Sequence, residues 1–143
     1  MKDMTDSREP YADRSQLESL VRGFESCTLA EFKHASHLSV ALWYLARLPE
    51  AEAFVRMREG LHRFAAHHHS NLYHETITIF WLRFVRHFIT RSDHNTPTHV
   101  LANQLADSRP DVRLIFDYYS QERLSSDEAK TSWIEPDLKP LDF

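Results

Sequence analysis

Two stretches of the chain carry histidines, one of them next to a glutamate, and could share a metal ion or a proton. His34 and His37 stand three residues apart in "EFKHASHLSV", and His74 precedes Glu75 in "NLYHETITIF". On a helix, side chains three residues apart project from one face about 5 to 6 Å apart, so two imidazoles at this spacing can hold one metal ion. The sequence therefore predicts a metal site formed by His34, His37 and His74.

Glu75 and Tyr44 are the candidate catalytic residues beside this site. Neighbouring residues on a helix point about 100° apart, which makes simultaneous ligation by His74 and Glu75 difficult and favours Glu75 as a general base over a ligand. Tyr44 follows His37 on the same predicted helix, where its hydroxyl would lie at the edge of the site. Such a site suits Fe or Cu in oxidative chemistry, and equally Zn or Ni acting as a Lewis acid.

The leading hypothesis is thus a small metal-dependent enzyme that acts on an unknown small molecule. In the alternative, the histidines are structural and donate to backbone carbonyls, while Glu75 is favoured at a helix N-terminus by the macrodipole. The protein would then be a non-catalytic helical module that binds a ligand or a partner. Its apolar pocket would be lined by aromatic side chains, namely Trp43, Tyr44, Tyr73 and Trp81.

Apolar residues that recur every three to four positions predict helices as the elements that carry these side chains. Four main helices are expected at about residues 15–26, 28–48, 49–64 and 73–90. Shorter helices are expected at about residues 97–106 and 111–119, followed by a last turn or two after Ser126. The helix at 28–48 is apolar on most sides and should be central.

Capping residues predict where three of the main helices begin. Ser15 is the expected cap of the first helix, and Asn71 that of the fourth. Thr28 followed by Glu31 has the spacing of a capping box, which places the start of the second helix near residue 28.

Length and composition indicate one all-α domain, a helical bundle of four main helices with short C-terminal ones. The chain has 143 residues, 42% of them hydrophobic, and only two glycines, which is few for a protein rich in β-turns. Residues 1–14 are polar and aperiodic, and are expected to form a flexible arm ahead of the domain at 15–143. From about residue 135 the prolines of "EPDLKPLDF" predict an extended tail.

The charge and the cysteine content narrow the partners and the compartment. A formal charge of −4 with dispersed basic residues argues against nucleic acid as a partner. Arg47, Arg83 and Arg86 interrupt the apolar runs, so no membrane span is expected. The single cysteine, Cys27, and the lack of a signal-peptide pattern favour the cytoplasm.

The chain shares three motifs with a group of other proteins, in the stretches "FKHASHLSVALWYL", "YHETIT" and "SWIEPDLKPL". It resembles an uncharacterised group of short bacterial all-helical proteins that share F-x-H-x-x-H, Y-H-E-T and W-x-E-P-D-L in that order. The match covers about residues 17–141. The resemblance implies that these stretches form one unit, and it implies no particular reaction. The three consecutive histidines at 67–69 belong to none of its motifs.

Overall fold

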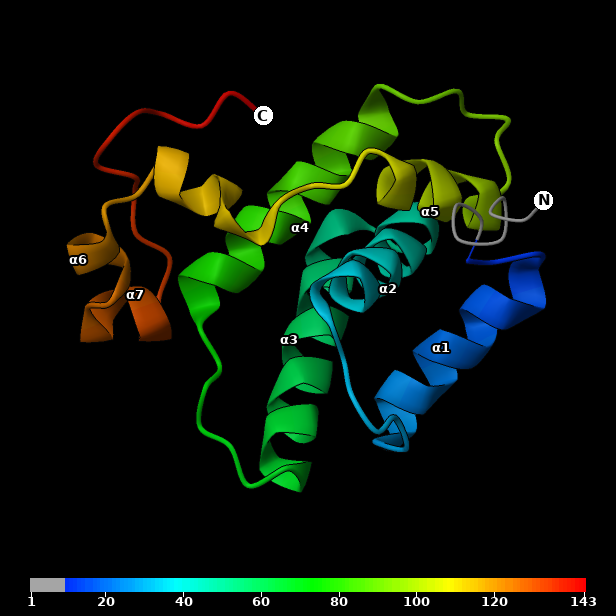
Figure 1. Ribbon diagram of the computed structural model, residues 1–143, viewed down its shortest axis with the longest axis horizontal. Helices are drawn as coiled ribbons and strands as arrows, with labels where there is room; N and C mark the ends of the chain where they lie inside the picture. Colours follow the sequence, from blue (N-terminus) through cyan, green and yellow to red (C-terminus); the bar gives the residue numbers. More distant parts are fainter. Residues whose placement is uncertain (1–9) are drawn as a thin grey trace, which may run out of the picture.

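The computed structural model describes residues 10–143, and within this range all regular secondary structure is helical (Figure 1). The prediction of an all-α protein is therefore confirmed for the described residues. The flexible arm predicted at residues 1–14 falls mostly on residues 1–9, which lie outside them. No helix within residues 10–143 combines the length and the hydropathy that crossing a membrane requires.

Within residues 10–143, four longer helices are followed by four shorter ones. The longer helices are α1 (Arg14–Ser26), α2 (His34–Arg47), α3 (Glu50–His67) and α4 (Glu75–Thr90). The shorter ones are α5 (Thr98–Asp107), the 3-10 helix η2 (Val112–Asp117), α6 (Gln121–Leu124) and α7 (Asp127–Thr131). Most lie where the apolar periodicity predicts them, whereas α6 has no counterpart in the predicted set.

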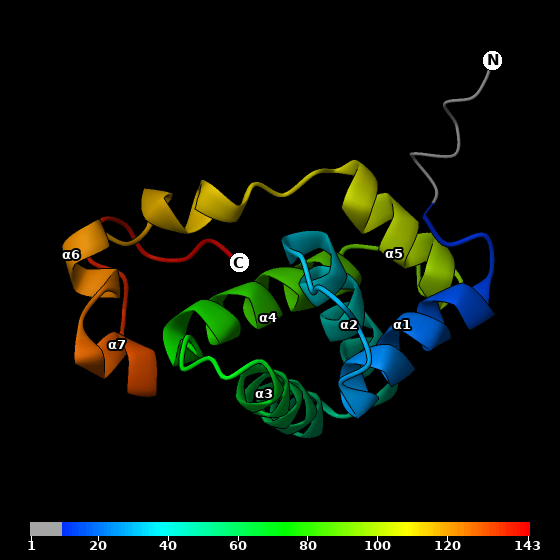
Figure 2. The same cartoon turned by 60° about the horizontal axis from the view of Figure 1, so that its bottom comes forward.

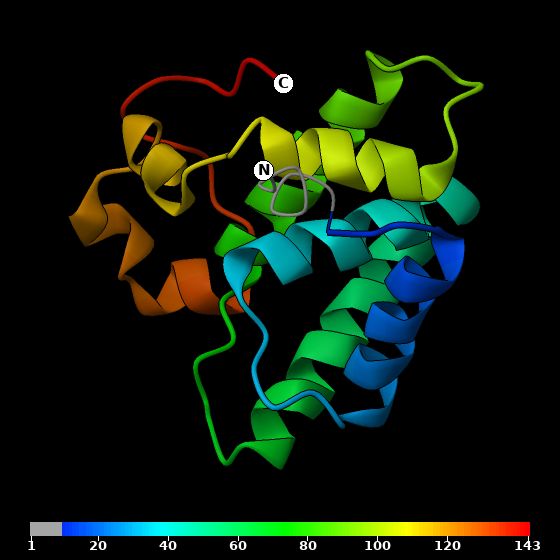
Figure 3. The same cartoon turned by 45° about the vertical axis from the view of Figure 1, so that its right-hand side comes forward.

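Helix α2 lies at the centre of the fold. Its residues 38–44 are all buried, as expected for a helix that is apolar on most sides. Helices α1, α3, α4 and α5 all pack against it, and Figure 2 shows them arranged around α2. Figure 3 shows α5 lying along α2 with α1 beside both. Side chains on α2 can therefore reach several neighbouring helices.

The start of α2 differs from the prediction because the backbone of Thr28 closes α1. The amide of Thr28 donates to the carbonyl oxygen of Gly23 at 2.9 Å, and Cys27 adopts a left-handed conformation with φ of 59°. This pattern ends α1, so Thr28 belongs to the end of α1, and the N-cap of α2 is Lys33. Helix α2 starts six residues later, at His34, after Phe32 has packed against Phe24 with ring centroids 4.6 Å apart.

The N-cap of α1 also differs from the predicted one. Asp13 is the N-cap, and its carboxylate accepts from the amide of Gln16 at 3.1 Å. Ser15, the predicted cap, instead donates its hydroxyl to Asp13. Asp is as good an N-cap as Ser, so composition alone could not choose between them.

The C-terminal segment packs along α4. Helix α7 contacts α4, and no helix follows after Thr131. Two contacts stabilise the position of the tail. The Tyr119 hydroxyl donates to the carbonyl oxygen of Ile134 at 2.6 Å. The Phe143 ring packs edge-on against Phe80.

Candidate functional site

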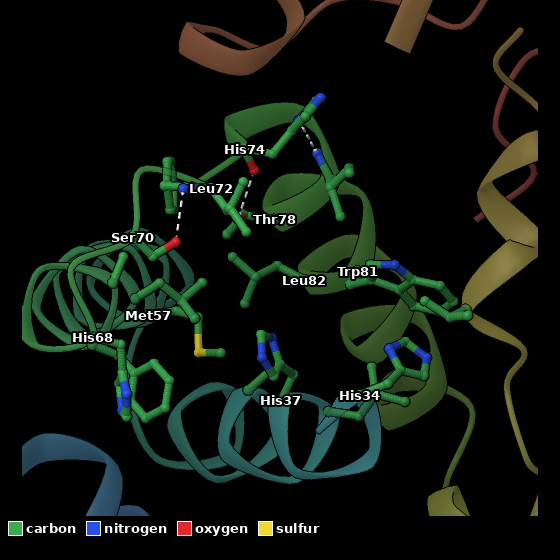
Figure 4. A pocket seen from close by; sticks show the side chains of 18 residues that line it. His34, His37, Met57, His68, Ser70, Leu72, His74, Thr78, Trp81 and Leu82 are labelled. Carbon is green, nitrogen blue, oxygen red and sulfur yellow. Dashed lines mark hydrogen bonds between the residues drawn. The ribbon is translucent and has the colours of Figure 1, made fainter. Parts of the chain in front are cut away.

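A cavity of about 570 Å³ lies between α2, α3 and α4, under the loop that joins α3 to α4 (Figure 4). Its walls are mainly apolar side chains of the three helices: Leu38, Ala41, Met57, Leu61, Phe64, Ile77, Trp81 and Leu82. No aspartate, glutamate, lysine or arginine is among the described residues that line it. Two further lining residues, Leu72 and Val112, are 84% and 56% exposed and so mark its open side.

Several polar side chains in the wall are already satisfied within the protein. The Thr78 hydroxyl donates to the carbonyl oxygen of His74 at 2.8 Å. The hydroxyl of Ser70 accepts from the amide of Leu72 at 3.1 Å. Both hydroxyl groups therefore take part in hydrogen bonds within the protein, and the wall also holds four imidazole rings, those of His34, His37, His68 and His74.

The ring of His37 is directed from α2 into the cavity. Figure 4 shows it pointing toward Leu82 with the sulfur of Met57 beside it. Its other face stacks on Phe32, with ring centroids 4.2 Å apart. The pKa of His37 is lowered to about 4, mainly by burial and also by the nearby His34, while the backbone of Phe32 opposes both effects. The ring is therefore neutral at pH 7.

His34 lies one turn earlier on α2 and also lines the cavity. Its ring packs edge-on against Trp81, with centroids 4.6 Å apart and an interplanar angle of 71°. Burial lowers its pKa, while the backbone of Pro110 and the charge of Asp111 raise it. The Nε2 atom is buried and has no hydrogen-bond partner, an uncommon state for a polar atom inside a protein.

His74 caps α4, and both of its ring nitrogens are used. Its Nδ1 accepts from the amide of Ile77 at 3.2 Å, and its Nε2 lies 2.7 Å from the carbonyl oxygen of Leu124. A carbonyl can only accept, so Nε2 carries the hydrogen and Nδ1 supplies its lone pair to the helix. His74 therefore takes the capping position predicted for Asn71, and it has no free lone pair for a metal.

The three predicted metal ligands consequently do not act together in this structure. His34 and His37 share one wall of the cavity, whereas the ring nitrogens of His74 are bound to backbone groups. Among residues 10–143 there is no group of three or more His, Cys, Asp or Glu side chains placed to hold a metal ion. The geometry thus gives no support to a three-histidine metal site.

Glu75, the predicted base, does not line this cavity and pairs with Arg58 of α3. Arg58 donates to both carboxylate oxygens at 2.9 to 3.2 Å, and the Tyr73 hydroxyl donates to one of them at 2.5 Å. Burial raises the pKa of Glu75, but the hydrogen bonds from Arg58 and Tyr73 lower it more, so it lies below its ordinary 4.5. Glu75 is not among the residues that line the cavity.

Tyr44 likewise lies outside the cavity. Its hydroxyl donates to Glu25 at 2.6 Å, and burial together with this hydrogen bond raises the pKa of Tyr44. With Trp43 it lines a separate, smaller cavity of about 190 Å³. Of the four aromatic residues proposed for an apolar pocket, only Tyr73 and Trp81 line the cavity that holds His34 and His37.

The wall contributed by α3 is the part of the site that sequence reasoning did not identify. Met57, Leu61 and Phe64 form the apolar stripe expected of a surface helix, and nothing in their spacing distinguishes a stripe that faces a cavity from one that is fully packed. The pairing of Arg58 with Glu75 could not be predicted from the sequence either, because the two residues are 17 positions apart and lie on different helices.

Comparisons with protein-family models, with curated protein sequences and with solved structures found no match for this chain. The resemblance to the group that shares the three motifs therefore stays a prediction. The geometry of the cavity is the basis for assigning a function.

Proposed function

We propose that the protein binds an apolar small molecule in the cavity between α2, α3 and α4. The observation that carries this proposal is a space of about 570 Å³ whose described lining holds no charged side chain and whose wall presents the His37 ring. Ligand sites in proteins typically enclose about 300 to 1,000 Å³ and combine apolar walls with a few polar groups. The cavity has both properties.

The open side of the cavity supports the same function. Leu72 is 84% exposed and Val112 is 56% exposed, and both belong to the lining. Large apolar side chains in water at the edge of an apolar space are typical of a binding site. Water inside the cavity would find few hydrogen-bond partners, so an apolar ligand would displace it favourably.

A fluorescence titration with the neutral probe N-phenyl-1-naphthylamine tests this function. Ala41 lines the cavity and Ala46 is an exposed residue of the same helix, so Ala41→Leu and Ala46→Leu add the same atoms inside and outside it. We expect saturable binding by the wild type and by Ala46→Leu, and at least about tenfold weaker binding by Ala41→Leu. Leu61→Phe, which fills the cavity from α3, should weaken binding as well.

Two outcomes would reject binding in this cavity. One is the absence of saturable fluorescence in the wild type, and the other is equal affinity in the wild type and both cavity-filling variants. Far-UV circular dichroism of each variant verifies that its helices are intact.

A metal-dependent enzyme is the second candidate, because the Nε2 atom of His34 is buried without a partner. His34 and His37 could hold Fe, Cu, Zn or Ni from one helix face, with the other positions filled by substrate or water. Metal analysis of untagged protein purified without nickel resin tests it. About one metal per chain that is lost in His34→Ala and His37→Ala, but kept in His68→Ala, would support it. A metal-free wild type would reject it.

A further inference from the structure

The cavity restricts the charge of any ligand that enters it. None of the described lining residues is an aspartate, glutamate, lysine or arginine. A carboxylate, phosphate or ammonium group at the buried end of a ligand would lose its hydration without gaining an opposite charge. The end group of the ligand must therefore be neutral.

The histidines in the wall differ in the access of their ring nitrogens to the cavity. His68 is exposed to solvent at the edge of the cavity. Both ring nitrogens of His74 form hydrogen bonds with backbone groups, and the Tyr73 hydroxyl donates to Glu75. The Nε2 atom of His34 is shielded inside the protein, next to Trp81. The ring of His37, by contrast, points into the open space (Figure 4).

The surroundings of His37 determine which kind of hydrogen bond it offers. His37 stacks on Phe32, and the backbone of Phe32 raises the pKa of His37, which is the effect of a carbonyl that accepts from the ring. The nitrogen that faces this carbonyl carries the hydrogen, so in the neutral ring the other nitrogen has a lone pair and accepts. A matching ligand group has to donate.

We propose that the ligand is an apolar alcohol or phenol whose hydroxyl group is buried and donates a hydrogen bond to His37. This rests on the proposed function, since it specifies the ligand of the same cavity. A ketone or an ether of equal size has no hydrogen to donate and would leave the His37 lone pair unpaired, which is unfavourable in an apolar space.

Displacement of N-phenyl-1-naphthylamine by matched ten-carbon compounds tests the proposal. 1-Decanol donates a hydrogen bond, 1-methoxydecane only accepts one, and decanoate carries a charge. We expect 1-decanol to displace the probe at about a tenfold lower concentration than either of the others, as one net hydrogen bond would predict.

Variants of two cavity histidines then assign the preference to a residue. In His37→Phe, which retains an aromatic ring beside Phe32, 1-decanol and 1-methoxydecane should displace the probe equally. His37→Gln, which still offers an acceptor, should keep part of the preference, and His68→Phe should keep all of it. Each variant is used only if its thermal unfolding is cooperative, and the glutamine variant provides the comparison if the phenylalanine variant does not fold.

The outcomes separate this inference from the function on which it rests. If the wild type does not bind the probe, the proposed function fails, and the inference fails with it. If the probe binds but 1-methoxydecane or decanoate competes as well as 1-decanol, only the hydroxyl preference is overturned. The same holds if His37→Phe prefers 1-decanol as strongly as the wild type does.

Discussion

The Nε2 atom of His74 lies 2.7 Å from the carbonyl oxygen of Leu124, fifty residues further along the chain. Next to it, the buried hydroxyl of Thr76 lies 2.7 Å from the carbonyl oxygen of Ala129 and 2.9 Å from that of Ser132. The "YHET" stretch thereby joins the start of α4 to the C-terminal helices. These contacts occupy the polar groups of His74 and Thr76 within the protein.

Replacing Thr76 by valine should destabilise the protein with little change in shape. The substitution removes the hydroxyl and leaves two buried carbonyl oxygens without this donor, which costs about 1 to 3 kcal/mol. Thr90→Val is the matched control, because Thr90 is exposed at the end of the same helix. Urea unfolding should show the loss for Thr76→Val alone, and equal midpoints for the two variants would contradict the contacts described for Thr76.

Glu75→Gln should affect stability and leave ligand binding unchanged. The substitution removes a charge-assisted pair with Arg58 that is only partly shielded from solvent, a change worth about 1 kcal/mol. The pKa of Glu75 is lowered in the native state, so this stabilisation is present above the unfolded pKa and is lost as the pH falls through the native value. The difference from wild type should thus shrink in acid.

Affinity for N-phenyl-1-naphthylamine provides the second readout for Glu75→Gln. Because Glu75 lies outside the cavity, the dissociation constant should stay within about twofold of wild type. A tenfold loss of affinity in a folded Glu75→Gln protein would place this carboxylate in the site after all. Glu59→Gln, at an exposed position of α3, controls for the loss of one negative charge.

The stability of the protein should fall on mild acidification because of His37. Its pKa is lowered from 6.5 to about 4, so between these values the unfolded chain binds more protons than the native protein. The contribution of His37 to the free energy of unfolding therefore rises with pH across this window and is constant above it. Its maximum is about 3 kcal/mol. Urea unfolding from pH 4 to 8 should show a smaller fall for His37→Phe than for wild type. Parallel curves for the two proteins would contradict this assignment.

Local patterns predicted the helices well but not the contacts that define the site. The spacing of Leu17, Val21 and Phe24 is enough to predict α1, because a helix of this kind depends on its own apolar face. The role of His74 depends on its contact with Leu124, and the residues around His74 in the sequence do not indicate that contact. A pair of histidines on one helix face is equally compatible with a metal site and with the wall of an apolar cavity.

Gly60→Ala should destabilise the protein although alanine is the better helix former. A β-carbon on Gly60 would overlap the ring of Phe24, which is fully buried and cannot move away. Alanine normally gains about 1 kcal/mol over glycine within a helix, and overpacking here should outweigh this gain by about 1 to 2 kcal/mol. Gly23→Ala, whose close contacts are with the side chain of Leu29, should cost less. A higher melting temperature for Gly60→Ala would contradict the close packing of α1 on α3.

Methyl NMR spectra recorded during a titration with 1-decanol locate the bound ligand most directly. The methyl groups of Met57, Ile77 and Leu82 line the cavity, whereas those of Val55 and Leu138 are exposed elsewhere. Binding between α2, α3 and α4 predicts saturable shifts and ligand contacts at the first three residues, with Val55 and Leu138 unchanged. Shifts confined to the exposed methyl groups, or no shifts at saturating 1-decanol, would contradict a ligand site in this cavity.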